Sequence, residues 1–218
     1  MHMKIIPEIN PSELSKKGRL LLVTGGAASG KSAFAEELSR SMPRDGKLFY
    51  VATMYWDRTD PETQERVLRH RRQRCGKGFE TIERERRIAG LTDWLRPGDV
   101  MLLEDLSNLL ANEMFPWWEE SEGEPDLFGK KSRFREDGGA AFSQFIEEKI
   151  VKPVVEMYRS GISVVAVGSS ITEEIPREMD YSTALYIKGL MQIQREIGQT
   201  ADQVYEVVCG IPMSCKSG

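Results

Sequence analysis

The sequence predicts an α/β fold: a mostly parallel sheet between two layers of helices, forming a three-layer sandwich. Short apolar runs alternate with segments of helical spacing along most of the 218 residues, which is typical of a parallel sheet. A glycine-rich loop at residues 25–32 joins the first apolar run to the first helical segment. Hydrophobic residues make up 40% of the chain, enough for one substantial core, and two full domains would hardly fit this length.

The expected elements follow from two periodicities. Short apolar runs bounded by glycine or a carboxylate predict buried strands, and a 3.6-residue apolar spacing predicts helices. In the first part of the chain the expected elements are, in order, a strand over 19–24, a helix over 31–42 closed by Pro43, a strand over 48–52, a strand over 99–104 and a helix over 107–115. Between the second and third strands, the charged segment over 61–74 is a helix if Val67 and Leu68 face a core.

The second part is interrupted before the pattern resumes. Pro116, Trp117, Trp118 and a charged run predict an insertion or lid over 116–139. Two adjacent exposed tryptophans indicate a subunit contact or a lid over a large ligand, and we expect a homo-oligomer. The remaining expected elements are a helix over 140–158, a strand over 162–167, a helix over 181–197 and a last strand over 203–209. We therefore expect a loosely ordered leader at 1–18 and a single domain at 19–218.

Composition excludes several classes of protein. The net charge of −4 is unlike that of a general nucleic-acid binder. The N-terminus has neither a long apolar core nor a small-residue cleavage site, and no apolar run approaches a bilayer span. We expect a cytoplasmic protein without a membrane span. The cysteines Cys75, Cys209 and Cys215 have no metal-ligand spacing and are expected to be reduced thiols, with Cys209 in the core.

The loop at 25–32 matches the pattern Gly-x-x-x-x-Gly-Lys-Ser/Thr, the phosphate-binding loop of P-loop NTPases. Its backbone N–H groups curl inward toward phosphate oxygens, and the following helix points its positive end at the same place. Lys31 would bridge the β- and γ-phosphates of GTP or ATP, and Ser32 would ligate Mg²⁺. Glu104, at the end of a strand, is the expected second magnesium ligand, although acidic residues also end strands for solubility alone. The predicted nucleotide contacts of this loop are Gly25, Gly26, Ala27, Ala28, Ser29, Gly30, Lys31 and Ser32.

The most cationic stretch of the chain, residues 66–74, surrounds His70, the only histidine outside the leader. Charge runs usually form a solvated helix face. The neighbouring arginines favour a neutral imidazole, which is a competent nucleophile toward a nucleotide α-phosphate, and they could neutralise charge on the phosphorus oxygens. A third alternative lies between a solvated helix face and a nucleophilic histidine: the arginines alone bind phosphate.

Several blocks together resemble the bifunctional adenosylcobinamide kinase and adenosylcobinamide-phosphate guanylyltransferase family of cobalamin biosynthesis. They occur in the family's order and cover most of residues 20–115 and 181–213. The arginine–histidine block and the tail are far more specific than a phosphate loop alone. The blocks are Leu22 to Glu36, Tyr50 to Thr53, Arg66 to Arg74, Gly78 to Glu83, Leu102 to Glu104, Asn108 to Glu113 and Glu206 to Pro212.

The resemblance implies two activities. A γ-phosphate is transferred to the aminopropanol hydroxyl of adenosylcobinamide, and GMP from GTP is then transferred to that phosphate through a guanylylated histidine. That histidine corresponds to His70. The family pattern also implies nucleotide contacts from Ala52, Thr53, Met54, Arg71, Arg72, Gln73, Arg74, Glu83 and Glu104. A carboxylate there could accept hydrogen bonds from a guanine edge.

The acceptor end departs from the family pattern. After the fourth strand the family has Val-Ser/Thr-Asn-Glu, whereas this chain has Gly168, Ser169 and Ser170 after Val167. In the last helix a Gly-x-x-Asn pattern becomes Met191-x-x-Gln194. Loss of a carboxylate could remove a substrate hydroxyl contact or a general base. Two alternatives therefore stay open: a P-loop kinase of this lineage with another acceptor, and a nucleotide-binding protein without turnover.

Overall fold

The computed structural model of the chain describes residues 18–42, 44–55, 60, 64–65, 76–122, 138–170 and 181–217. Their strands form one seven-stranded sheet in the order β3-β2-β4-β5-β1-β6-β7. All neighbouring strands are parallel except β6 and β7, which pair antiparallel. The strands are β1 (Leu20–Gly25), β2 (Leu48–Ala52), β3 (Glu80–Glu83), β4 (Val100–Glu104), β5 (Ser163–Ser169), β6 (Gln203–Val208) and β7 (Ile211–Lys216).

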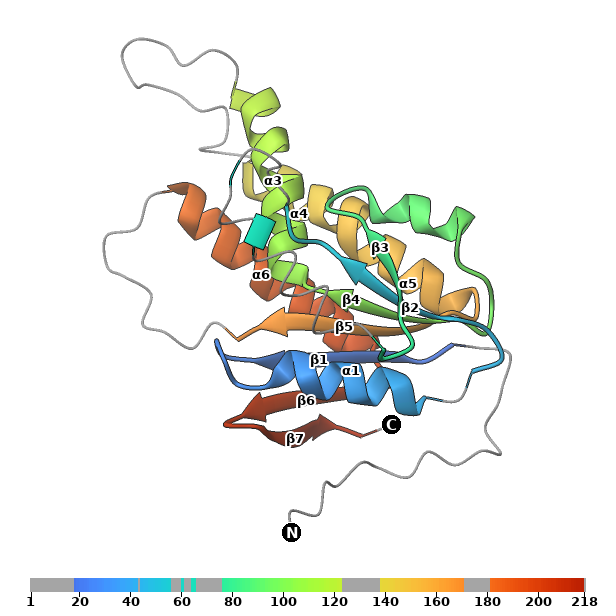
Figure 1. Cartoon of the computed structure of the whole chain (residues 1–218). Coiled ribbons are helices and arrows are strands. Elements are labelled where there is room, and N and C mark those ends of the chain that lie inside the picture. Colours follow the sequence, from blue (N-terminus) through green and yellow to red (C-terminus); the bar gives the residue numbers. More distant parts are fainter. Residues whose placement is uncertain are drawn as a thin grey trace.

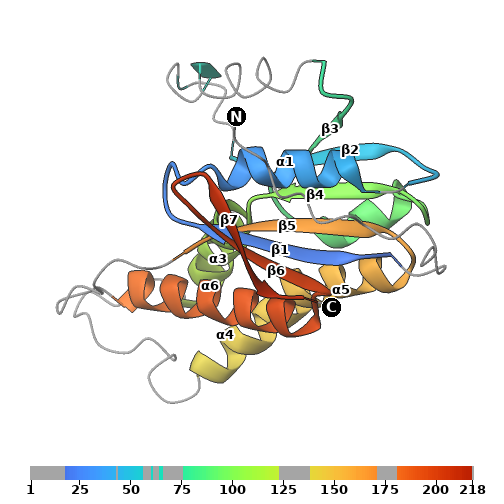
Figure 2. The ribbon, with the colours of Figure 1, turned by 90° about the horizontal axis from the view of Figure 1, so that it is seen from below.

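Helices cover both faces of this sheet (Figures 1 and 2), so the predicted three-layer sandwich is confirmed. On one face α1 (Lys31–Ser41) packs through Ala35 and Leu38 against side chains of the inner strands. The larger core lies on the other face, beneath five helices and one helical turn. These are η2, a 3-10 helix (Ile88–Asp93), α3 (Leu106–Glu122), α4 (Gly138–Ile146), the π-helical turn η4 (Glu147–Val151), α5 (Lys152–Arg159) and α6 (Tyr181–Thr200).

The central strands are buried on both faces, as their unbroken apolar runs indicate. In β1 the residues Leu20, Leu21 and Val23 are fully buried, and the same holds for most of β4 and β5. Side chains alternate between the two cores along each strand. The carboxyl ends of the parallel strands consequently meet at one edge, where the phosphate loop begins.

Two edge strands were not predicted from the sequence. β3 reads Glu-Thr-Ile-Glu and is mostly exposed, so it lacks the apolar run by which the inner strands were recognised. β7 follows a two-residue turn made by Cys209 and Gly210, both with positive φ, a hairpin geometry that an X-Gly pair favours. Cys209 is therefore exposed at the tip of a hairpin, and the expectation of a core position was wrong.

The helix expected to end at residue 115 continues to Glu122, with Pro116 inside it. Pro116 removes one backbone donor, but Trp117 in the next position stacks on Phe145 with ring centroids 4.9 Å apart and lies 5.2 Å from Phe142. This packing onto α4 outweighs the local cost of the proline. Trp117 is thus partly buried and packed against the larger core, whereas the sequence predicted an exposed side chain. The side chain of Trp118 and residues 123–137 lie outside the described part of the chain.

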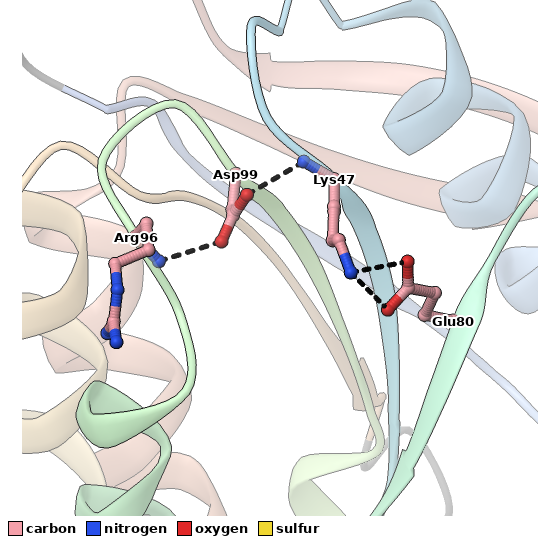
Figure 3. Close-up of polar contacts among 4 residues, drawn as sticks. All are labelled: Lys47, Glu80, Arg96 and Asp99. Carbon is pink, nitrogen blue, oxygen red and sulfur yellow. Dashed lines mark hydrogen bonds and ion pairs between the residues drawn. The ribbon is translucent and has the colours of Figure 1, made fainter.

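At the opposite, amino edge of the sheet, Asp99 joins the segments that lead into β2 and β4 (Figure 3). Its buried carboxylate accepts backbone hydrogen bonds from Lys47 and Arg96, both at 2.7 Å. The Lys47 ammonium lies 3.0 Å from both carboxylate oxygens of Glu80, a pair that is largely exposed. In the described part of the chain, no helix is long and apolar enough to cross a membrane.

Candidate nucleotide-binding site

The phosphate loop forms a compact turn at the carboxyl edge of the sheet, between β1 and α1. The N–H of Ser29 donates to the carbonyl of Gly26 at 3.3 Å. Ala28 and Gly30 have φ values of 55° and 90°, which curl the backbone so that α1 begins at Lys31. The Lys31 ammonium donates to the Gly26 carbonyl at 3.1 Å. This cationic group therefore lies over the loop, at the amino end of α1, where both the helix and the ammonium attract an anion.

The hairpin between β6 and β7 packs against the phosphate loop. The N–H of Gly210 donates to the carbonyl of Ser29 at 2.8 Å. A Cβ on Gly30 would lie 3.3 Å from the Cα of Gly210, and a Cβ on Gly25 would lie only 2.7 Å from the carbonyl oxygen of Val207. The glycines at both ends of the loop are thus needed because the backbone of β6 and its turn passes so close.

Ser32 and Glu104 meet at the start of α1 and the end of β4. The Ser32 hydroxyl donates to Oε1 of Glu104 at 2.6 Å, while Oε2 is buried without a hydrogen-bond partner among the described residues. Burial raises the pKa of Glu104 to about 7, against the lowering effect of the Ser32 hydrogen bond. A carboxylate with one buried, unpartnered oxygen beside a hydroxyl is a donor set that suits Mg²⁺, which takes one or two protein ligands together with phosphate oxygens.

A second group of contacts fixes the position of Glu104 through the backbone. The fully buried Thr53 donates its N–H to the Glu104 carbonyl at 2.9 Å, and its hydroxyl lies 2.8 Å from the Asp105 carbonyl. The Asn112 amide donates to the Thr53 carbonyl at 2.7 Å and to the Glu85 carbonyl at 3.2 Å. The segments that follow β2, β3 and β4 are therefore joined in one hydrogen-bonded network beneath the site.

Asp105 ends this network at the start of α3. Its Oδ1 accepts the N–H of Asn108 at 2.7 Å, which caps the helix. Burial raises the pKa of Asp105, although the hydrogen bond from Asn108 acts in the other direction. Two carboxyls with raised pKa values thus stand side by side at the end of β4, near the ammonium of Lys31.

The structure brings many of the predicted site residues to one edge. Glu83, Ala52 and Glu104 are register partners at the ends of three adjacent strands, and the phosphate loop lies two strands further along. The Thr53 side chain faces the interior and supports Glu104, while its contact with a nucleotide stays a prediction. His70, Arg71, Arg72, Gln73 and Arg74 lie outside the described residues.

Several residues that shape the site were not identified as such from the sequence. Gly210 and Asn112 belong to blocks with a family resemblance, but their hydrogen bonds reach Ser29 and Thr53, which are so distant along the chain that spacing alone does not reveal them. The one local signal was the X-Gly pair at Cys209-Gly210. Among the described residues, no cluster of three or more His, Cys, Asp or Glu side chains could hold a metal.

The fold and this edge define a protein of the P-loop NTPase-like class. Residues 21–215 match the family described as cobinamide kinase / cobinamide phosphate guanyltransferase, and the chain belongs to that family. It is accordingly a transferase.

Two curated relatives are similar over 90% of this chain and 99% of their own length. Both are named bifunctional adenosylcobalamin biosynthesis protein CobU: that of Escherichia coli K12 is 27% identical, and that of Salmonella typhimurium LT2 is 28% identical. Among solved structures, the flagellar accessory protein FlaH of Methanocaldococcus jannaschii is 14% identical with a TM-score of 0.40, and the match covers 93% of this chain and 80% of FlaH. A protein of Pyrococcus horikoshii OT3 is 11% identical with a TM-score of 0.45, over 94% of this chain and 89% of its own.

Proposed function

We propose that this protein phosphorylates adenosylcobinamide and then transfers GMP from GTP to the product, through a guanylylated His70. The observation that carries the proposal is the contact between Ser32 and Glu104 beneath a phosphate loop that also holds Lys31. Family membership over residues 21–215 supports the acceptor and the two reactions.

In the first reaction the chain's task is to hold the triphosphate and screen its charge. Inward-facing N–H groups of the loop and the positive end of α1 bind the β-phosphate, and Lys31 reaches the γ-phosphate. Ser32 and Glu104 would hold Mg²⁺, which supplies charge neutralisation at the phosphates. The acceptor hydroxyl oxygen forms a bond to the γ-phosphorus as the bond to the bridging oxygen breaks. The nucleoside diphosphate leaves, and the hydroxyl proton is released to water.

In the second reaction a nitrogen of His70 forms a bond to the α-phosphorus of GTP, and pyrophosphate leaves. The phosphate oxygen of the phosphorylated acceptor then attacks the same phosphorus, which releases the imidazole. A neutral imidazole is the competent nucleophile for this step, and the arginines of 66–74 offer cations for the phosphorus oxygens.

Labelling with nucleotide tests both halves. With α-labelled GTP, the wild-type protein should acquire an acid-labile label that His70→Ala abolishes. His2→Ala is the matched control, since the chain has two histidines, and it should label like the wild type. With γ-labelled nucleotide and adenosylcobinamide, label should appear in the corrinoid, and Lys31→Ala should reduce this transfer by about 10-fold to 100-fold.

The alternatives give different results. Corrinoid phosphorylation without protein labelling would contradict the guanylyl step and leave a kinase. Nucleotide hydrolysis or binding with neither product would favour a different acceptor or a protein without turnover. The departures at Gly168, Ser169 and Ser170 are the observation that keeps a different acceptor as the second candidate. We also expect a cytoplasmic homo-oligomer, and size-exclusion chromatography with light scattering can test its oligomeric state.

A further inference from the structure

Beside the phosphate loop, on the face of the sheet away from α1, a carboxylate from β6 lies against a hydroxyl that follows β5. The Ser170 hydroxyl donates to Oε1 of Glu206 at 3.4 Å. We infer that this Ser170–Glu206 pair receives the hydroxyl of the phosphate acceptor, with Glu206 accepting its hydrogen bond. The inference rests on the proposed kinase activity and extends it to a named acceptor subsite.

Both residues lie beside the start of the phosphate loop. The N–H of Ser170 donates to the carbonyl of Gly25 at 3.0 Å. Glu206 is the register partner of Thr24, and the next residue of β6, Val207, is the partner of Gly25. The pair therefore flanks the point where β1 becomes the phosphate loop. A Cβ on the adjoining Gly26 would meet no described atom within 4 Å, so no described residue fills the space at this point.

The direction of the Glu206 side chain follows from the alternation of β6. Tyr205 and Val207 pack in the core beneath α1, whereas Val204 packs in the core beneath α6. Glu206 therefore projects on the α6 side. On that side the Gln194 amide donates to the carbonyl of Ser169 at 2.8 Å, which holds the segment containing Ser170 in place.

The described hairpin side chains beside Glu206 are apolar and exposed. In the antiparallel hairpin, Glu206 pairs with Met213 and Val208 pairs with Ile211, and directly opposed residues project to the same face. Val208, Ile211 and Met213 are 45%, 65% and 46% exposed. No lysine or arginine of the described residues forms an ion pair with Glu206. A carboxylate that no described cation pairs, in an apolar surface beside a phosphate loop, fits a large acceptor with an apolar body and a hydroxyl group.

The pair includes one of the residues after β5 that differ from the family pattern. The family pattern has an amide and a carboxylate there, and this chain has two hydroxyls instead. In the folded chain Ser170 contacts Glu206, which belongs to the tail block that resembles the family, and the carbonyl of Ser169 accepts a hydrogen bond from Gln194 of α6.

The test compares acceptor and nucleotide affinities of Glu206→Gln, Glu206→Leu and Ser170→Ala. Glu206→Leu should raise the KM for adenosylcobinamide by about 10-fold to 100-fold, the usual effect of losing a hydrogen bond to a charged group. Glu206→Gln and Ser170→Ala should have smaller effects in the same direction. The KM for nucleotide, and the Kd for Mg-GTP from calorimetry, should stay within about twofold because the pair does not bind phosphates.

A direct titration gives a second readout. The Kd of adenosylcobinamide, followed by its visible absorbance with a non-hydrolysable triphosphate present, should rise in parallel with KM in each variant. Glu156→Gln is the matched control, because Glu156 is an exposed, ion-paired carboxylate of α5. An active Glu206→Leu variant with wild-type acceptor KM and Kd would overturn the subsite alone. A wild-type protein that does not phosphorylate adenosylcobinamide would instead overturn the proposed function, and the subsite with it.

Discussion

The Ser32 hydroxyl donates a hydrogen bond of 2.6 Å to Glu104, whose second carboxylate oxygen is buried without a partner among the described residues. The two residues are 72 positions apart, and they meet because β1 and β4 both end at the same edge of a parallel sheet. A buried oxygen without a partner costs free energy, and this cost is relieved when a cation or a proton binds to it.

In the metal-free and nucleotide-free protein, we expect the free energy of unfolding to fall as the pH rises from about 4.5 to about 7 on account of Glu104. Burial raises the pKa of its carboxyl from 4.5 to about 7, so across this window the folded protein holds a proton that the unfolded chain has lost. Stability then decreases with pH, by at most about 1.4 kcal/mol per pH unit from this group.

Urea unfolding in EDTA, at about pH 5 and about pH 7.5, measures this contribution by linkage. The side chain introduced by Glu104→Gln cannot ionise, so the variant should lack this part of the pH dependence. At the higher pH it should be more stable than the wild type. The exposed Glu156→Gln variant should keep the wild-type dependence. Equal pH dependence in wild type and Glu104→Gln would contradict the assignment.

The close approach of β6 to the phosphate loop predicts that Gly25→Ala is damaging. Its Cβ would lie 2.5 Å from Oγ of Ser29 and 2.7 Å from the carbonyl of Val207. We expect a loss of about 1–3 kcal/mol in the free energy of unfolding, as for other overpacked sites. Because the loop must move to relieve the clash, the affinity for Mg-GTP should fall as well.

Gly139→Ala provides the comparison, since a Cβ there meets no described atom within 4 Å. Gly139 lies in α4, where alanine is favoured over glycine by about 0.5–1 kcal/mol. Calorimetric nucleotide titration and urea unfolding of both variants distinguish the cases. A Gly25→Ala protein with unchanged Kd for nucleotide would show that the hairpin does not set the loop's shape.

Sequence patterns predicted those parts of the molecule that depend on local chemistry. The inner strands were recognisable because burial on both faces requires unbroken apolar runs such as Leu20 to Val23. The phosphate loop and the position of Glu104 were also recognisable from local sequence. The loop requires glycines and a lysine at fixed spacing, and Glu104 directly follows an apolar run. β3 was missed because an exposed edge strand has no such requirement.

The contacts that organise the site depend on tertiary structure and could not be predicted in this way. Gly210 donates to Ser29, and Asn112 joins Thr53 to Glu85, because the fold brings strand ends together. The continuation of α3 past Pro116 has the same origin: packing of Trp117 outweighs the local preference of proline to end a helix.

The aromatic packing between α3 and α4 predicts a structural role for Trp117. Its ring stacks on Phe145 and lies against Phe142, so Trp117→Ala should lower the free energy of unfolding by about 2–4 kcal/mol. Trp94→Ala, at a position 66% exposed, should change it by no more than about 0.5 kcal/mol. Urea unfolding gives both values. Unchanged stability of Trp117→Ala, with weakened corrinoid binding, would instead support the lid expected from the sequence.

The amino edge of the sheet offers a test in which stability changes without nucleotide binding. Asp99 accepts two backbone N–H groups, from Lys47 and Arg96, through its two carboxylate oxygens (Figure 3). In Asp99→Asn one of these oxygens becomes an NH₂ group, which leaves a buried N–H unpaired and should cost about 1–3 kcal/mol. Glu80→Gln, which weakens only the exposed pair with Lys47, should cost about 0–1 kcal/mol.

Neither variant should alter the Kd for Mg-GTP, because Asp99 immediately precedes β4 and Glu104 is the last residue of that strand. The length of the strand separates the two carboxylates, and the network around Thr53 holds Glu104 independently of the amino edge. Urea unfolding and calorimetry on the same preparations measure the two quantities. A parallel loss of nucleotide affinity in Asp99→Asn would mean that the register of β2 against β4, and not the network at their carboxyl ends, determines the geometry of the magnesium ligand.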